Sequence, residues 1–145
     1  MYIYILTHSG CPAGWVTHGV SCYYLDPTRT RWVVDAKQKC QNLGAHLPII
    51  KSANEKDFIF DMLRKHQSLT IEGVWLGLER RAGSTFYWVD GTPLSYQAWG
   101  GGEPNNSGGN ENCVQMYKGG GNAGMWNDTP CDYEVSPGVL CQKPI

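Results

Sequence analysis

The chain has 145 residues and a formal net charge of -1, and 17% of its residues are charged. This length fits one domain with a sizeable apolar core. The near-neutral charge, without any block of lysine or arginine, excludes an electrostatic surface for nucleic acid or for an acidic membrane. Six cysteines without Cys-x-x-Cys spacing indicate a disulfide framework in an oxidising compartment, so we expect a secreted or extracellular protein. Spacing alone leaves 15 pairings of six cysteines open.

The first ten residues differ from the rest of the chain. Residues 1–6 are apolar but have no basic flank and are too short for a signal core or a membrane span. We expect residues 1–10 to form a strand or a remnant of processing, and residues 11–145 to form one domain. A longer natural precursor would then carry the secretion signal. Residues 11–24 have the pattern of a hairpin turned near His18-Gly19, with Cys11 and Cys22 in its two arms.

Two helices are predicted next. The first spans residues 31–42, with Thr30 as a candidate N-cap and Gly44 as its stop. Its apolar positions recur at helical spacing: Trp32, Ala36, Cys40 and Leu43. The second helix begins at the capping box Ser52-Ala53-Asn54-Glu55. An apolar stripe behind that box is expected to face the core: Phe58, Ile59, Met62 and Leu63.

Beyond residue 74 the pattern changes to short strands and long polar loops. Strands are predicted at residues 74–78, 86–89, 113–117, 125–126 and 139–141. Glycine-rich stretches at residues 100–102, 108–109 and 119–124 are expected to be loops. Four tryptophans within or beside this pattern are expected in the core rather than on a sugar-stacking surface: Trp75, Trp88, Trp99 and Trp126. The sequence therefore predicts an α+β fold.

Oxygen-bearing side chains gather in two clusters between residues 103 and 128. The first contains Glu103, Asn105 and Glu111, and the second contains Asn127 and Asp128. Three carboxylates and two amides suit a hard cation that needs six to eight oxygen ligands, which indicates calcium rather than zinc. Cys113 and Cys131 flank the clusters, and a disulfide between them would hold both clusters in one loop.

Four motifs in this order resemble the C-type lectin domain family over about residues 11–144. They are Trp75-Leu76-Gly77-Leu78, Glu103-Pro104-Asn105, Trp126-Asn127-Asp128 and Gly138-Val139-Leu140-Cys141. The resemblance implies two helices flanking small antiparallel sheets, a long loop region, the additional N-terminal hairpin of the long form, and a cis Glu103-Pro104 bond. It also implies three disulfides: Cys11 with Cys22, Cys40 with Cys141, and Cys113 with Cys131.

The resemblance implies a site as well. One calcium ion would be held by five side chains that also contact the sugar: Glu103, Asn105, Glu111, Asn127 and Asp128. Two neighbouring sugar hydroxyls would bind the ion while the acids accept their protons and the amides donate to them. The acid-then-amide order of Glu103-Pro104-Asn105 accompanies mannose, fucose and N-acetylglucosamine in this family. We therefore expect carbohydrate binding of the mannose type without catalysis, in glycan recognition or innate defence.

Several alternatives stay open from the sequence. Galactose binding at the same calcium site is one, and a protein-binding or ice-binding member of the fold is another. Asn105 and Asn127 each begin a glycosylation sequon, although a glycan on either amide would abolish the calcium site. A metal-dependent hydrolase is disfavoured because no candidate base lies near the ligands.

The sequence departs from the family pattern in two places. Ala82, Asn106 and Asn112 stand where acids for a second calcium ion would be expected, which leaves Glu79 and Glu111 without further acids. A second ion is therefore not expected, and the insertion at residues 119–124 should change one wall of the sugar site. No collagen-like or heptad segment is present, so any homo-oligomer must form through the domain or through residues 2–6.

Overall fold

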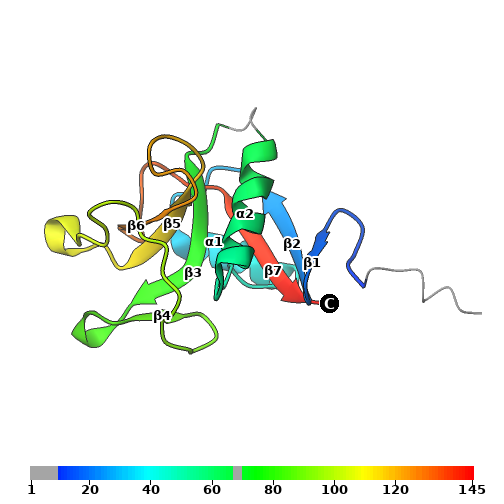
Figure 1. Ribbon diagram of the computed structural model, residues 1–145, viewed down its shortest axis with the longest axis horizontal. Coiled ribbons are helices and arrows are strands. Elements are labelled where there is room, and N and C mark those ends of the chain that lie inside the picture. Colours follow the sequence, from blue (N-terminus) through cyan, green and yellow to red (C-terminus); the bar gives the residue numbers. More distant parts are fainter. Residues whose placement is uncertain (1–9, 67–69) are drawn as a thin grey trace, which may run out of the picture.

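The computed structural model describes residues 10–66 and 70–145 and has an α+β fold (Figure 1). Its α-helices are α1 (Val33–Asn42) and α2 (Ala53–Lys65). Its strands are β1 (Val16–His18), β2 (Ser21–Asp26), β3 (Gly73–Arg80), β4 (Phe86–Trp88), β5 (Cys113–Tyr117), β6 (Trp126–Thr129) and β7 (Val139–Pro144). Two short 3-10 turns are η2 (Ala82–Ser84) and η3 (Ser107–Gly109). The strand predicted at residues 2–6 lies outside the described residues.

The strands form two antiparallel sheets with the orders β1-β2-β7 and β4-β3-β5-β6. Figure 1 shows the first sheet on the side of the C-terminus and the second on the opposite side, with α2 between them in this view. Backbone hydrogen bonds join the two sheets, because Trp75 N donates to Gly138 O at 3.1 Å and Gly138 N donates to Gly73 O at 2.9 Å. The β1-β2 hairpin turns between His18 and Ser21, as the sequence predicts.

The core is built around three fully buried tryptophans, Trp75, Trp88 and Trp126. The Trp88 and Trp126 rings meet edge to face at 5.6 Å, and Trp75 Nε1 donates to the Thr30 carbonyl at 2.8 Å. The prediction of a core position is confirmed for these three. Trp99 is only partly buried and lies at the edge of the core, where its Nε1 donates to Gln97.

Helix α2 begins as its capping box predicts. Ser52 is the N-cap, and its hydroxyl accepts a hydrogen bond from Glu55 N. The Glu55 carboxylate accepts from Lys51 N rather than from Ser52 N, so the reciprocal bond is shifted by one residue. Three residues of the predicted apolar stripe are buried: Ile59, Met62 and Leu63. Phe58 packs at the edge of the stripe, half-buried against Tyr23 and His18.

The prediction for α1 is wrong at the N-terminal end of the helix and is confirmed at its C-terminal end, Asn42. The helix begins at Val33, because Trp32 is extended and forms a bridge to Asp132. Thr30 is no N-cap, since Val33 N is satisfied by the Cys131 carbonyl instead. Trp32 and Leu43 are 48% and 42% exposed, although both were expected on the buried face. The buried face consists of Val33, Ala36 and Cys40, and Gly44 ends the helix with φ of 70°.

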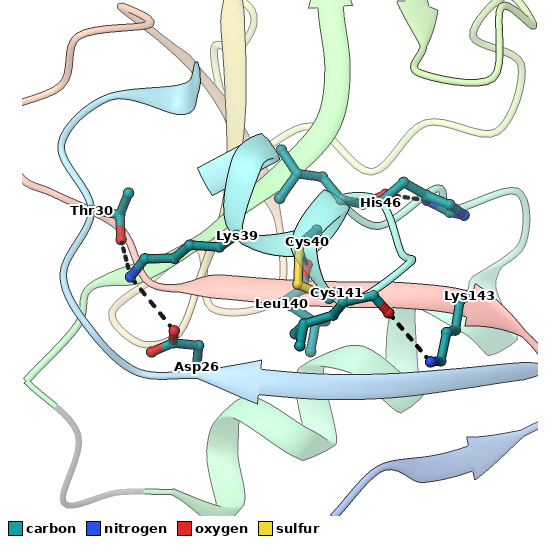
Figure 2. Close-up of a disulfide and its surroundings, with 10 residues drawn as sticks. Asp26, Thr30, Lys39, Cys40, His46, Leu140, Cys141 and Lys143 are labelled. Atoms are coloured by element: carbon teal, nitrogen blue, oxygen red, sulfur yellow. Dashed lines mark hydrogen bonds and ion pairs between the residues drawn. A yellow bond between two sulfur atoms is a disulfide. The ribbon is translucent and has the colours of Figure 1, made fainter. Parts of the chain in front are cut away.

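The three disulfides implied by the resemblance are present: Cys11–Cys22, Cys40–Cys141 and Cys113–Cys131. Figure 2 shows the second of these joining α1 to β7, with Lys39 reaching Asp26 at 3.5 Å on the same side of the helix. The Cys113–Cys131 disulfide joins β5 to the segment after β6. Gly10 packs against Ile145, so the two ends of the described chain lie close together.

Candidate functional site

The fold brings the two predicted clusters together. Residues 100–112 form a loop that returns to the sheet at β5, and β5 pairs with β6 so that Val114 lies opposite Asp128 and Gln115 opposite Asn127. Asp128 is fully buried, and Asn127 is 8% exposed. The Cys113–Cys131 disulfide closes the same unit. The loop cluster and the β6 cluster therefore meet at the end of the β5-β6 pair.

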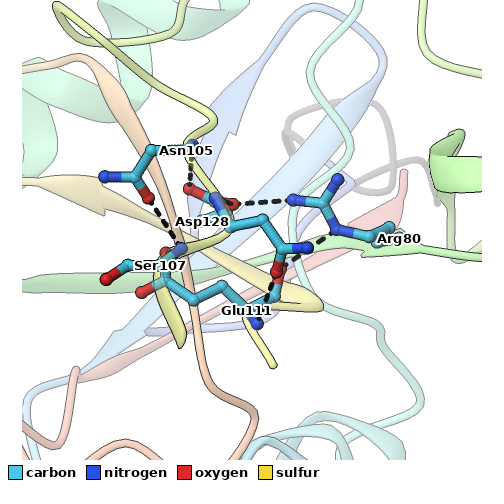
Figure 3. A network of polar contacts seen from close by, with 6 residues as sticks. Arg80, Asn105, Ser107, Glu111 and Asp128 are labelled. Atoms are coloured by element: carbon cyan, nitrogen blue, oxygen red, sulfur yellow. Dashed lines mark hydrogen bonds and ion pairs between the residues drawn. The ribbon is translucent and has the colours of Figure 1, made fainter. Parts of the chain in front are cut away.

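Asp128 is the centre of the contacts within this cluster. Its Oδ1 accepts a hydrogen bond from Asn105 N at 3.1 Å, and its Oδ2 accepts from Asn106 N at 2.8 Å. Figure 3 shows Asn105, Ser107 and Glu111 arranged around this carboxylate. The loop is thus fastened to β6 through backbone N–H groups that donate to one buried acid.

Further bonds close the loop on itself. Ser107 N donates to Asn105 Oδ1 at 3.1 Å and to Glu111 Oε1 at 2.9 Å. Asn106 has a positive φ of 46°, a conformation that asparagine adopts more readily than most residues. Its Oδ1 accepts from Glu111 N at 3.1 Å. Asn106, which stands where the family often has an acid, therefore stabilises the turn of the loop.

Glu103 has an unsatisfied oxygen. Its Oε1 is buried and has no hydrogen-bond partner within the part of the chain that the structure describes. The Glu103-Pro104 peptide bond is cis, as the resemblance implies. Burial, and after it the neighbouring Asp128 carboxylate, raises the pKa of Glu103 to about 7. Burial also raises the pKa of Glu111. Both acids resist ionisation because burial disfavours their charged forms and the Asp128 carboxylate lies close to them.

The donor chemistry fits a hard cation. A carboxylate oxygen that is buried and unpaired is the kind of atom that calcium coordinates, and the cluster adds amide oxygens nearby. No group of three acidic, histidine or cysteine side chains in residues 10–66 and 70–145 is arranged to hold a metal by itself. Two of the five predicted ligands, Asn105 and Asn127, are amides, so the predicted calcium site depends on their side-chain oxygens as well as on the three carboxylates.

Arg80 belongs to the cluster, and the sequence reasoning missed it. Its Nη2 donates to Asp128 Oδ2 at 2.7 Å, and its Nε donates to the Glu111 carbonyl at 3.2 Å (Figure 3). The two side chains of this ion pair are 12% and 0% exposed. The signal that could have revealed Arg80 is its position two residues after the Trp-Leu-Gly-Leu motif, where β3 reaches the site.

Glu79, the other acid considered for a second ion, is paired elsewhere. Its carboxylate forms an ion pair with Lys37 of α1, and both side chains are about one-third exposed. Of the positions that lack acids, Ala82 is exposed within η2, and the Asn112 carbonyl accepts a hydrogen bond from Arg80 N at 2.9 Å. Two acids of this region are thus paired with basic side chains, Glu79 with Lys37 and Asp128 with Arg80.

The insertion at residues 119–124 lies beside the loop that leads to Glu103. Gly124 N donates to Tyr117 O at 2.9 Å, and the Asn122 amide packs against Gly100. The insertion lines a cavity of about 700 Å³ together with Arg64, Glu72 and Tyr117. None of the five candidate ligands lines this cavity, so the expected effect of the insertion on one wall of the sugar site stays a prediction.

The chain matches the model of one protein family and resembles several known proteins. The profile of the Lectin C-type domain matches residues 20–143. C-type lectin domain family 4 member G of Homo sapiens is 38% identical over 137 residues, which cover 92% of this chain and 43% of that relative. The chain thus spans less than half the length of this curated relative.

Two similar structures bear on the site. The C-type carbohydrate-recognition domain of cow CD23, determined in the presence of a GlcNAc2Man3 oligosaccharide, is 34% identical with a TM-score of 0.78. The alignment covers 93% of this chain and 96% of that one. A calcium-independent type II antifreeze protein is 32% identical with a TM-score of 0.76, and the alignment covers 95% of this chain and 98% of that one.

Proposed function

We propose that this chain, which belongs to the C-type lectin domain family, binds glycans through one calcium ion. The ion would be held by Glu103, Asn105, Glu111, Asn127 and Asp128. The observation that carries the proposal is the buried Glu103 Oε1, which lacks a hydrogen-bond partner among the described residues although it lies in a cluster of oxygen donors. The family assignment supports a carbohydrate-binding module and not an enzyme.

The side chains would act on the sugar by positioning two neighbouring hydroxyls. Calcium supplies a Lewis-acidic centre that the oxygens of these hydroxyls can join as ligands. The carboxylates of Glu103 and Glu111 would accept hydrogen bonds from the hydroxyl groups, and the amide groups of Asn105 and Asn127 would donate hydrogen bonds to the hydroxyl oxygens. Each hydroxyl is then satisfied as donor and acceptor, and no bond of the sugar breaks.

The sugar class follows from the order of acid and amide. Glu103 precedes Asn105, and exchanging donor and acceptor around the ion would change which pair of hydroxyls can satisfy both partners. This order favours mannose, fucose or N-acetylglucosamine over galactose. No aromatic side chain lies between residues 105 and 113 to pack against the apolar face of galactose.

The test is competitive elution from immobilised mannose in calcium. Mannose should release the protein at a concentration at least tenfold lower than galactose does. The double variant Glu103→Gln with Asn105→Asp has the reversed order and should shift this ratio toward galactose. Preferential release of the unaltered chain by galactose would contradict the mannose assignment, while release by EDTA would still support the calcium site.

A second candidate function is binding to protein or ice without calcium. The similarity to the calcium-independent antifreeze protein favours it, because that protein has a similar fold and does not depend on calcium. The Arg80–Asp128 ion pair also gives the loop one cationic contact without a metal. A glycan array with calcium and with EDTA separates the candidates: glycan signals lost in EDTA support the lectin, and an absence of signals in both conditions supports the alternative.

We also propose residues 11–145 as the domain and an extracellular location for it. All six cysteines are in disulfides, which persist in oxidising compartments. No helix among residues 10–66 and 70–145 is long and apolar enough to cross a membrane. One shallow site binds weakly, so useful avidity requires several sites in one homo-oligomer. Light scattering of the full chain and of a chain that begins at Gly10 tests whether residues 1–9 contribute to assembly.

A further inference from the structure

The guanidinium of Arg80 lies between two segments that are far apart in the sequence. Its Nη2 donates to Asp128 on β6, and its Nε donates to the Glu111 carbonyl at the end of the loop. The Phe86 ring covers it, with Arg80 Cζ 4.5 Å from the ring centroid, a distance suited to a cation–π contact. With the side chain 12% exposed, the position of this charge is fixed by its surroundings.

Asp128 needs this charge. Its side chain is fully buried, and a buried carboxylate without a cationic partner is strongly disfavoured. Three donors approach it: Arg80 Nη2, Asn105 N and Asn106 N. A carboxylate offers about four acceptor positions, so these three bonds leave room for a calcium contact while they fix the orientation of the carboxylate.

The loop in turn depends on Asp128. Residues 105 and 106 are fastened to that carboxylate, and Ser107 and Glu111 close the loop behind them. Arg80 is therefore connected to the loop in two ways: through Asp128, which binds residues 105 and 106, and through its own hydrogen bond to the Glu111 carbonyl.

We propose that Arg80 is a positioning residue: a resident cation that keeps residues 105–111 assembled when no calcium is bound. Acids for a second ion are missing on this side of the site, and Arg80 supplies a positive charge there by pairing with Asp128. Lys37 pairs with Glu79 in the same way. The inference uses the proposed calcium ligands, but its central claim concerns the metal-free protein.

The test is hydrogen–deuterium exchange of the full chain in EDTA and in calcium. In EDTA, Arg80→Gln should raise the exchange rate of the amides of residues 105–107 and 111 at least tenfold over the unaltered chain. Calcium should lower these rates by a larger factor in Arg80→Gln than in the unaltered chain. Arg80→Lys, which keeps the charge, should restore at least part of the protection in EDTA.

Arg81 provides the matched control. It is the next residue, it is exposed, and its Cζ lies 5.2 Å from the Tyr87 ring centroid, so Arg81→Gln removes a similar side chain without touching Asp128. Arg81→Gln should leave exchange of the loop within twofold of the unaltered chain. Amides of the β2-β7 pair report whether each variant keeps its fold.

Three results would overturn the proposal: equal loop protection in Arg80→Gln and the unaltered chain in EDTA, no recovery in Arg80→Lys, or no protection of the unaltered loop in EDTA. If Arg80→Gln does not fold, Arg80→Lys and the unaltered chain still decide the question. Failure of the proposed function is a separate result, since it would appear as absence of calcium binding in a calorimetric titration while the exchange measured in EDTA is unaffected.

Discussion

The two sides of the molecule are held together by different interactions. The helix side, which consists of α1, α2 and the β1-β2-β7 sheet, is stabilised by fully buried apolar residues such as Ile59, Leu63 and Leu140 and by the Cys40–Cys141 disulfide. The loop side, which consists of residues 100–112 with β6, is held by N–H and guanidinium groups that donate to Asp128 and Glu111. Apolar packing responds little to pH or metal, whereas contacts to carboxylates respond to both.

The largest expected effect is on the helix side. Replacing Cys40 and Cys141 together by alanine should lower the free energy of unfolding by about 4 to 5 kcal/mol, because a loop of about 100 residues is released in the unfolded chain. Calcium and sugar affinities of the fraction that remains folded should stay within twofold. Urea denaturation and sugar binding at low temperature measure the two quantities. A loss of calcium affinity without unfolding would show that the two sides are not separate.

On the loop side, Asp128→Asn should abolish calcium-dependent sugar binding and lower the free energy of unfolding by about 3 kcal/mol or more, because it leaves a nearly buried guanidinium without its anion. Asp132→Asn is the matched control. Asp132 pairs with Arg31, but the side chains of that pair are 35% and 48% exposed, so its loss should cost about 1 kcal/mol at most. Similar losses in both variants, measured by urea denaturation, would contradict the burial argument.

Removal of calcium should have a smaller effect. At a calcium concentration of about 100 times its dissociation constant, binding to the folded state adds about 2.7 kcal/mol, which corresponds to a rise in Tm of about 5 to 10 °C for a chain of this size. Calorimetry with calcium and with EDTA measures the difference. Leu63→Ala on the helix side should lower Tm in both conditions and leave the difference unchanged; an unchanged Tm on chelation of the unaltered chain would argue against the calcium site.

The smallest effect concerns pH. The folded pKa of Glu103, about 7, lies above its ordinary value of 4.5, so protonated Glu103 favours the calcium-free folded state. That contribution is fully present below about pH 4.5 and is lost as pH rises through 7. Calcium needs the ionised form, so its affinity should fall by up to about tenfold per unit as pH drops below 7.

Calorimetric titration of calcium at pH 5.5 and at pH 7.5 tests the pH effect. Thermal unfolding of Glu103→Gln in EDTA supplies the control, because this variant lacks the titrating group and should lose the stability change that the unaltered chain shows between pH 4.5 and 7. Equal calcium affinities at the two pH values would contradict the assignment of Glu103 as a ligand.

The sequence predicts the helix side well where local rules apply. The Ser52 capping box and the stripe through Ile59 and Leu63 depend on neighbours within one or two helical turns, and both are confirmed. The α1 prediction is wrong at Trp32 and Leu43. Helical spacing cannot reveal that Trp32 forms a long-range bridge to Asp132, so that the helix begins only at Val33.

The loop side is predicted only in part. Residue types and motif order place Glu103 and Asp128 in one cluster, and the structure brings them together. The Arg80–Asp128 contact joins residues 48 positions apart, and no spacing rule links an arginine at the end of a strand to an acid on another strand. The same limit hides the pairing of Lys37 with Glu79.

The closeness of Gly10 and Ile145 has a mechanical consequence. Figure 1 shows the C-terminus on one side of the molecule and residues 103–112 on the opposite side, so a pulling force on a ligand at the proposed site would cross the whole domain before it reached either end. Near those ends the load is shared by the antiparallel β2 and β7 strands, paired from Ser21 with Pro144 to Asp26 with Val139, and by the covalent bridge from α1 to β7. We expect residues 100–112, which are held by hydrogen bonds and an ion pair, to yield under tension before the side that contains β2 and β7.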